Sequence, residues 1–231
     1  MGERTTITTS GGSFSAYVAR PRAASAPAVV VIQEIFGVNQ VMRDIADGLA
    51  GQGYLAICPD LFWRIEPDVD ITDRSEAEWK KAFELFNAFD VDQGVKDIAA
   101  TISTIRKDPG CNGKVGAVGF CLGGLLAFLT AARTDADASV SYYGVGIENR
   151  VAEAEKLTRP LLMHIAEEDQ FVPKAAQAVI LQALKDHPQV EIYTYPGRDH
   201  AFARPGGEHY DEADARLAGG RSLQFFKRHI G

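Results

Sequence analysis

The sequence has few cysteines, no long apolar run and no excess of positive charge. Its three cysteines form no Cys-x-x-Cys pair and stand at unrelated spacings, which excludes a disulfide framework and the usual zinc-binding patterns. A reducing, cytoplasmic setting is therefore expected. The first apolar run covers only residues 28–32, and residues 1–13 contain no apolar segment of a secretion signal. Neither a membrane span nor export is expected.

Negative charge dominates, with 24 Lys and Arg against 31 Asp and Glu and a formal net charge of −7. A negative surface argues against nucleic acid or an anionic membrane as the main partner, so a small molecule is the expected one. The sequence has no Walker A pattern and no His-Glu-x-x-His, so no cofactor and no metal is expected. A monomer and a small homo-oligomer both agree with these properties.

The 231 residues are 46% hydrophobic and 24% charged, which excludes a disordered or fibrous chain. There is no repeat and no low-complexity tract. The only linker-like stretch, residues 21–27, lies too close to the start of the chain to separate domains. A single domain over residues 1–231 is therefore expected.

Short apolar strands alternate with helical patterns after an N-terminal hairpin, which the alternating residues around Gly11-Gly12 predict. Strands alternating with helices favour an α/β fold, with a mostly parallel sheet covered by helices on both faces. Ligands in such sheets bind beyond the carboxyl ends of the strands. The later strands are predicted at 27–32, 54–58, 114–120, 138–143, 160–165 and 190–195, and the helices at 38–51, 91–106, 122–133, 173–186 and 210–229.

The stretch Gly119-Phe120-Cys121-Leu122-Gly123 follows the strand predicted at 114–120. It matches the Gly-x-Ser-x-Gly nucleophile elbow with cysteine in place of serine. A sharp strand-to-helix turn leaves no room for side chains at the flanking positions, which explains the glycines. Cys121 would then lie at a helix N-terminus, where the helix dipole favours a thiolate. A buried structural cysteine in a glycine-rich turn is the alternative that the pentapeptide leaves open.

Two further reactive groups follow predicted strands. Asp169 comes after the strand at 160–165, and His200 lies in the loop after the strand at 190–195. The order Cys121, Asp169, His200 is that of nucleophile, acid and base in α/β-hydrolases. Taken singly, a helix cap explains Asp169 and a surface loop explains His200. Three such groups at strand ends, in this order, favour catalysis.

The residues after the strand at 27–32 indicate how an oxyanion would be bound. The backbone amides of Ile35 and Leu122 are the candidate donors, because one donor normally follows the nucleophile and the other comes from this first loop. Glu34 stands among apolar neighbours, so its carboxylate must be paired or protonated. Arg204, in the loop that carries His200, is a candidate partner.

A series of motifs runs in order through nearly the whole chain, at Gln33 to Asn39, Cys58 to Leu61, Ala88 to Asp90, Gly113 to Gly124, Tyr142 to Gly146, Glu167 to Pro173 and His200 to Arg204. With these motifs the sequence resembles the dienelactone hydrolases, also called carboxymethylenebutenolidases. The resemblance implies an α/β-hydrolase fold and a triad of Cys121, His200 and Asp169. It also implies that Glu34 helps to activate the thiol, and that Arg204 holds this carboxylate until the carboxylate of the substrate takes the arginine.

Two positions depart from the family pattern. Trp79 stands where the family's best-known members carry a second carboxylate-binding arginine, and Ala201 replaces the serine of the family's His-Ser-Phe-Ala-Arg motif. We expect Trp79, Phe36 and Tyr142 to line the substrate site together with Arg204. The expected function is hydrolysis of a lactone or ester that bears a carboxylate, through a thioester on Cys121. A general carboxylesterase or thioesterase with the same triad, a non-catalytic small-molecule receptor and a thiol redox sensor are the alternatives.

Overall fold

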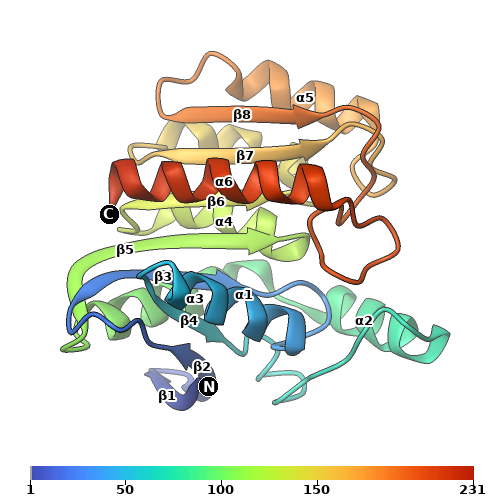
Figure 1. The fold of residues 1–231 in the computed structure, drawn as a ribbon. Coiled ribbons are helices and arrows are strands. Elements are labelled where there is room, and N and C mark those ends of the chain that lie inside the picture. Colours follow the sequence, from blue (N-terminus) through green and yellow to red (C-terminus); the bar gives the residue numbers. More distant parts are fainter. Residues whose placement is uncertain (1) are drawn as a thin grey trace. The chain divides into compact units, whose positions relative to one another are not determined.

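A computed structural model describes residues 2–231, whose eight strands follow the order β1-β2-β4-β3-β5-β6-β7-β8 (Figure 1). β1 and β2 form the predicted antiparallel hairpin, β2 pairs antiparallel with β4, and the pairs β3–β4, β6–β7 and β7–β8 are parallel. The prediction of a mostly parallel sheet is therefore confirmed. The strands are β1 (Glu3–Thr9), β2 (Gly12–Ala19), β3 (Ala26–Ile32), β4 (Leu55–Pro59), β5 (Cys111–Phe120), β6 (Ala138–Tyr142), β7 (Leu161–Ala166) and β8 (Val190–Tyr195).

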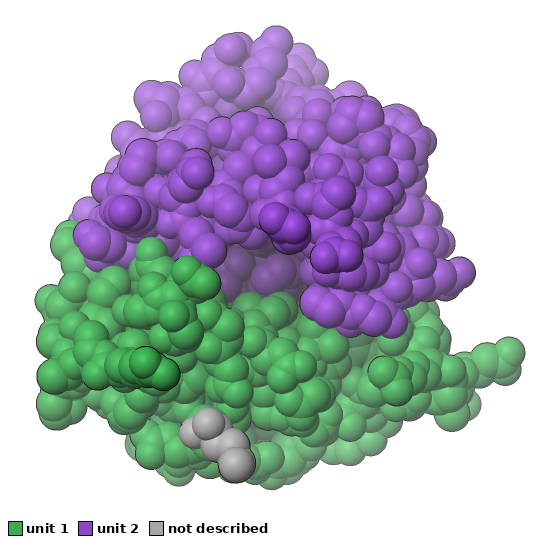
Figure 2. All heavy atoms as spheres, in the orientation of Figure 1, with its two compact units in different colours: residues 1–117 green, residues 118–231 purple. Residues whose placement is uncertain are grey.

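The chain divides into two compact units, Met1–Ala117 and Val118–Gly231, drawn in different colours in Figure 2. The boundary falls inside β5, which is a single continuous strand. The expectation of one domain over residues 1–231 stays a prediction.

Side-chain caps mark where α1, α2, α3 and α6 begin. α1 begins two residues later than predicted, because Asn39 caps it by accepting a hydrogen bond from the Met42 amide at 3.2 Å. Asp90 and Asp211 cap α3 and α6 in the same way. No helix within residues 2–231 is both long and apolar enough to cross a membrane. The helices are α1 (Gln40–Gly51), α2 (Glu76–Ala88), α3 (Val91–Arg106), α4 (Leu122–Arg133), α5 (Lys174–Leu184) and α6 (Glu212–His229), with short 3₁₀ turns η1 (Ile147–Asn149) and η2 (Val151–Lys156).

The second helix, α2, is absent from the predicted elements although the sequence carries a start signal for it. Ser75 accepts a hydrogen bond from the Glu78 amide and donates its own hydroxyl to the Glu78 carboxylate. Ser-x-x-Glu is the sequence of a capping box, although here the Glu78 carboxylate accepts from the Ser75 hydroxyl and not from the Ser75 amide.

β6 shows how the unit Val118–Gly231 is layered. Ser141 donates its hydroxyl to the Gly124 carbonyl in α4 at 2.8 Å, whereas the Tyr142 hydroxyl shares a 2.7 Å hydrogen bond with Ser222 in α6. Successive strand residues point to opposite faces, so α4 and α6 cover opposite faces of β6. Figure 1 shows α6 running across β6 and β7.

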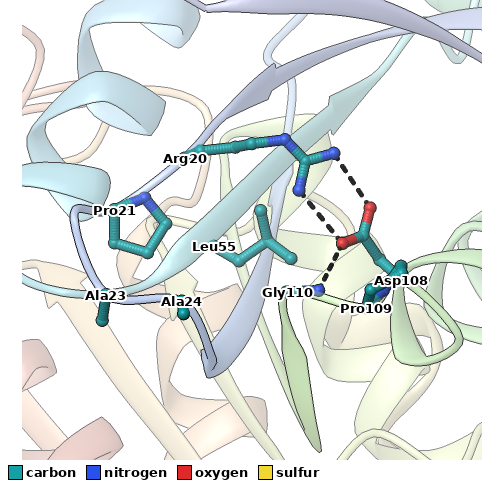
Figure 3. A pocket seen from close by; sticks show the side chains of 8 residues that line it. All are labelled: Arg20, Pro21, Ala23, Ala24, Leu55, Asp108, Pro109 and Gly110. Atoms are coloured by element: carbon teal, nitrogen blue, oxygen red, sulfur yellow. Dashed lines mark hydrogen bonds and ion pairs between the residues drawn. The ribbon is translucent and has the colours of Figure 1, made fainter.

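In the unit Met1–Ala117, a cluster of ion pairs around Arg20 joins the end of β2 to the turn before β5. Arg20 Nη1 and Nη2 donate to the two oxygens of Asp108 at 3.0 and 2.9 Å, and its Nε donates to Glu3 at 2.7 Å. The Gly110 amide also donates to Asp108, at 2.7 Å. The Arg20–Asp108 pair forms one wall of a cavity of about 440 Å³ (Figure 3), lined by Arg20, Pro21, Ala23, Ala24, Leu55, Asp108, Pro109 and Gly110.

We expect the Arg20–Asp108 ion pair to stabilise the fold in a pH-dependent way. The hydrogen bonds from Arg20 hold the pKa of the Asp108 carboxyl below its ordinary value. A carboxyl whose pKa is lower in the folded than in the unfolded chain stabilises the fold above its unfolded pKa, and this contribution is lost as the pH falls through the folded value. Asp108→Asn is therefore expected to cost about 0.5–1 kcal/mol at neutral pH, a small value because Arg20 is half-exposed.

Urea unfolding of Asp108→Asn and wild type at pH 7 and at about pH 3 tests this, because the difference should shrink at the acid end. Glu84→Gln, which removes one partner of an exposed helical pair with Lys80, is the matched control and should change stability little at either pH. A destabilisation by Asp108→Asn that is the same at both pH values would contradict the account.

Candidate active site

Cys121 lies at a sharp turn between β5 and α4 with backbone angles of φ 57° and ψ −118°. A non-glycine residue at positive φ is strained, and such strain is common where a fold aims a reactive side chain. The turn also explains Gly119, because a Cβ there would lie 1.9 Å from the Gly123 carbonyl oxygen. The predicted elbow is thus present in the backbone, and the half-buried Cys121 thiol stands before the first turn of α4.

The loops after β7 and β8 bring Asp169 and His200 together. His200 Nδ1 lies 2.9 Å from one Asp169 carboxylate oxygen and 3.1 Å from the other. The Asp169 carboxylate also accepts hydrogen bonds from the Phe171 and Val172 amides at 2.8 and 3.1 Å, and both side chains of the pair are buried. These bonds fix the carboxylate in place, so that it accepts a hydrogen bond from Nδ1–H and leaves Nε2 of His200 for chemistry.

His200 also shares a side-chain hydrogen bond with Cys121, which completes the sequence-predicted group within the unit Val118–Gly231. Burial by itself lowers the pKa of His200. Negative charge on Cys121 and the hydrogen bond to Asp169 outweigh burial and raise the pKa to about 10. The site therefore favours a proton on His200 whenever Cys121 carries a negative charge. An arrangement of this kind can form a thiolate and later deliver the proton to a leaving group.

Two aromatic rings that the sequence analysis did not select pack against His200. The ring centroid of Tyr143 lies 5.0 Å from that of His200 and the centroid of Phe171 lies at 4.8 Å, both in tilted, edge-to-face arrangements. The substrate-site residue predicted from the sequence is its neighbour Tyr142. The structure ties its hydroxyl to Ser222 and stacks its ring on Phe120, so its expected role in substrate binding stays a prediction.

A buried polar chain runs between β6, β7, β8 and α6. Arg221 donates to the Tyr195 hydroxyl at 3.1 Å, so the Tyr195 proton points to His164 Nδ1 at 2.8 Å. His164 then donates from Nε2 to Ser222 at 2.9 Å, and Ser222 shares its hydrogen bond with Tyr142. Burial lowers the pKa of His164 to about 3, which keeps its ring neutral. His164 is therefore a hydrogen-bonded histidine of the core.

Arg204 is half-buried in the loop after His200, where its amide donates to the Ala201 carbonyl at 2.9 Å. Its guanidinium lies against Gly207, because a Cβ at Gly207 would come within 2.9 Å of Arg204 Nε. The glycine therefore leaves room for the guanidinium to lie along the loop. Its role as a ligand for a substrate carboxylate stays a prediction.

In the unit Met1–Ala117, Glu34, Ile35 and Phe36 follow β3 and are 1%, 5% and 2% exposed. The Phe36 ring meets Trp79 edge-on with centroids 5.1 Å apart, and Trp79 donates its indole N–H to the Asp73 carbonyl at 2.9 Å. Phe36 and Trp79 therefore form one aromatic pair, as two residues of a shared pocket would. The roles of Glu34, Ile35, Leu122, Phe36 and Trp79 in catalysis or binding stay predictions.

The remaining cysteines differ from Cys121 in their surroundings. Cys58 is fully buried, and burial raises the pKa of its thiol well above the ordinary value, so it is unsuited to act as a nucleophile. Cys111 is the first residue of β5, whereas Cys121 follows the last. Among residues 2–231, no group of three or more His, Cys, Asp and Glu side chains is arranged to hold a metal ion.

Comparisons with known proteins identify the family of this chain. The sequence model of the dienelactone hydrolase family matches residues 14–230. The chain belongs to the dienelactone hydrolase family. Its relatives include the carboxymethylenebutenolidase of Pseudomonas putida, which is 41% identical over 215 residues that cover 93% of this chain and 91% of the relative. A protein from Azospirillum brasilense is 53% identical over 231 residues, 95% of each chain.

Solved structures of the dienelactone hydrolase family share the fold. A Klebsiella pneumoniae protein assigned to the dienelactone hydrolases matches with a TM-score of 0.86 and 30% identity, over 99% of each chain. The Anabaena variabilis dienelactone hydrolase matches with a TM-score of 0.73 at 17% identity, over 100% of this chain and 99% of the other. The α/β-hydrolase fold class is thereby confirmed, and this family member is a hydrolase that acts on a lactone or ester.

Proposed function

We propose that this chain cleaves a lactone or carboxylic ester whose substrate carries a free carboxylate, by acyl transfer to Cys121. The substrate class follows the names of the relatives, which are carboxymethylenebutenolidases. The observation that supports the chemistry most directly is the buried Asp169–His200 pair with Cys121 hydrogen-bonded to His200. A receptor that only bound a small molecule would need neither this acid nor this base.

In the proposed reaction, the Cys121 sulfur attacks the carbonyl carbon, and its proton passes to His200 Nε2. The tetrahedral oxyanion accepts hydrogen bonds from the Leu122 and Ile35 amides. The carbon–oxygen bond then breaks, the leaving oxygen takes the proton from His200, and a thioester remains. His200 next removes a proton from water, which attacks the thioester, and the returning proton releases the acid and the Cys121 thiol.

Asp169 positions His200 in this scheme and stabilises its protonated form. Glu34 is proposed to assist ionisation of the thiol, as the family resemblance implies. A reducing, cytoplasmic setting suits the proposal, since the chain's three cysteines are unpaired in the structure and Cys121 must stay a thiol to react.

The carboxylate preference is tested by comparing kcat/KM for a lactone acid and its methyl ester in wild type and in Arg204→Ala. An arginine binds a carboxylate through a fork of charge-assisted hydrogen bonds, so wild type should prefer the acid by about tenfold to a hundredfold. The preference should collapse in Arg204→Ala, and Arg204→Lys should recover only part of it. Trp79 stands in place of a second arginine and is held by its contacts with Phe36 and Asp73. The preference for the acid over the ester therefore depends on Arg204.

Arg216→Ala serves as the control, because it removes an exposed positive charge of the same unit and should leave the preference unchanged. Equal turnover of acid and ester by wild type would move the general carboxylesterase ahead of the proposed function. If Arg204→Ala keeps the full preference for the acid over the ester, the substrate carboxylate must be bound by another cation.

A further inference from the structure

The position of the His200 ring is not determined by its hydrogen bonds alone. Asp169 holds Nδ1, and His200 shares its other side-chain hydrogen bond with Cys121. Hydrogen bonds at the two nitrogens leave the imidazole free to rock about the line that joins them. Groups packed against the ring must limit this motion, because a base works only within a narrow range of angles.

The rings of Tyr143 and Phe171 supply that contact. Their centroids lie 5.0 and 4.8 Å from the centroid of His200, with interplanar angles of 63° and 73°. Both distances fall in the range of favourable aromatic pairs. His200 itself is 6% exposed, so these rings also limit the access of water to the imidazole.

The backbone at Tyr143 indicates that its ring is aimed at this place. Tyr143 has φ 37°, a value that a bulky residue adopts at an energetic cost. Its amide donates to the His164 carbonyl at 2.8 Å, which holds the strained turn at the end of β6. The ring then packs edge-on against Phe202 as well, with centroids 5.7 Å apart, and is 3% exposed. The strained backbone and the close packing of the ring together indicate that the direction of the Tyr143 side chain matters.

We infer that Tyr143 and Phe171 are positioning residues that hold the plane of the His200 imidazole for proton transfer. This inference rests on the proposed function, in which His200 is the base. It concerns the aromatic rings and not the Tyr143 hydroxyl. Replacing either ring with a flexible aliphatic side chain should therefore slow proton transfer while the substrate still binds.

The test uses Tyr143→Leu, Tyr143→Phe and Phe171→Leu. We expect each leucine variant to lower kcat by about three- to tenfold with little change in KM, and Tyr143→Phe to keep wild-type kcat because it keeps the ring. Phe171 is 37% exposed, so Phe171→Leu gives a result even where a change at the buried Tyr143 disturbs folding. Tyr193→Leu, which removes a ring stacked on the non-catalytic His164, is the control and should leave kcat unchanged.

A second readout does not depend on turnover. The proton on His200 Nδ1, held by Asp169, should give a downfield NMR signal in wild type and in Tyr143→Phe that broadens in the leucine variants. Unchanged kcat and signal in both leucine variants, an effect on KM alone, or an equal loss in Tyr143→Phe would overturn the inference. His200→Ala separates the two hypotheses: if that variant stays active, the proposed function fails, whereas an inactive His200→Ala beside unaffected leucine variants defeats only the positioning role.

Discussion

Replacing Cys121 with alanine is expected to lower kcat/KM for ester or lactone hydrolysis by about 10⁴-fold or more, because losing the nucleophile of a triad removes the covalent route. The fold should survive, since alanine tolerates the elbow about as well as cysteine and the thiol is only half-buried. The measurement is steady-state turnover, with circular dichroism to verify folding.

Cys111→Ala is the matched control, because Cys111 is also a half-buried free thiol but has no acid–base pair beside it. Its activity should equal that of wild type. Cys121→Ser should also be poor, since the surroundings of Cys121 suit a thiol and an alcohol ionises at far higher pH. A folded Cys121→Ala variant with near wild-type turnover would remove Cys121 from the mechanism.

Asp169→Asn is expected to lower kcat by about 10²- to 10⁴-fold with a smaller effect on KM. An amide at this position accepts poorly from Nδ1 and presents an N–H to the ring, so His200 adopts the wrong tautomer. The hydrogen bond to Asp169 is also one of the contacts that raise the pKa of His200. Its loss should lower that pKa, so His200 should give up its proton at lower pH in the variant.

The neighbouring Glu168→Gln tests whether the acid has been assigned to the correct residue. Glu168 is exposed and pairs with Lys174 on the surface, 2.9 Å from its Nζ. Its replacement should leave kcat within a factor of about two, because an exposed ion pair contributes little. If Glu168→Gln were the damaging change and Asp169→Asn the harmless one, the triad would have to be reassigned.

The proposed catalytic triad could be predicted from the sequence because each of its members obeys a local rule. The flanking glycines identify Cys121 as the centre of a nucleophile elbow. Asp169 and His200 each follow an apolar strand that can be predicted from its own residues. The bounds of α3, α4 and β8 agree with prediction for a similar reason. Apolar periodicity and caps such as Asp90 depend only on residues that are close together in the sequence.

Features that depend on residues far apart in the chain could not be predicted from the sequence. The strand predicted at 138–143 includes Tyr143, whereas β6 ends at Tyr142. Nothing in the sequence reveals that Tyr143 adopts a positive φ and that its ring packs against His200. Arg20 and Asp108 are 88 positions apart, and no pattern couples them. Such contacts are decided by the packing of strands and loops, which local propensity does not encode.

Mass spectrometry of the enzyme quenched in acid during turnover of an activated ester tests the central claim most directly. The account predicts that the peptide containing Cys121 gains the mass of the acyl group, and that hydroxylamine removes it as it does from a thioester. An acyl group on any other side chain, or undiminished turnover after alkylation confined to Cys121, would contradict it.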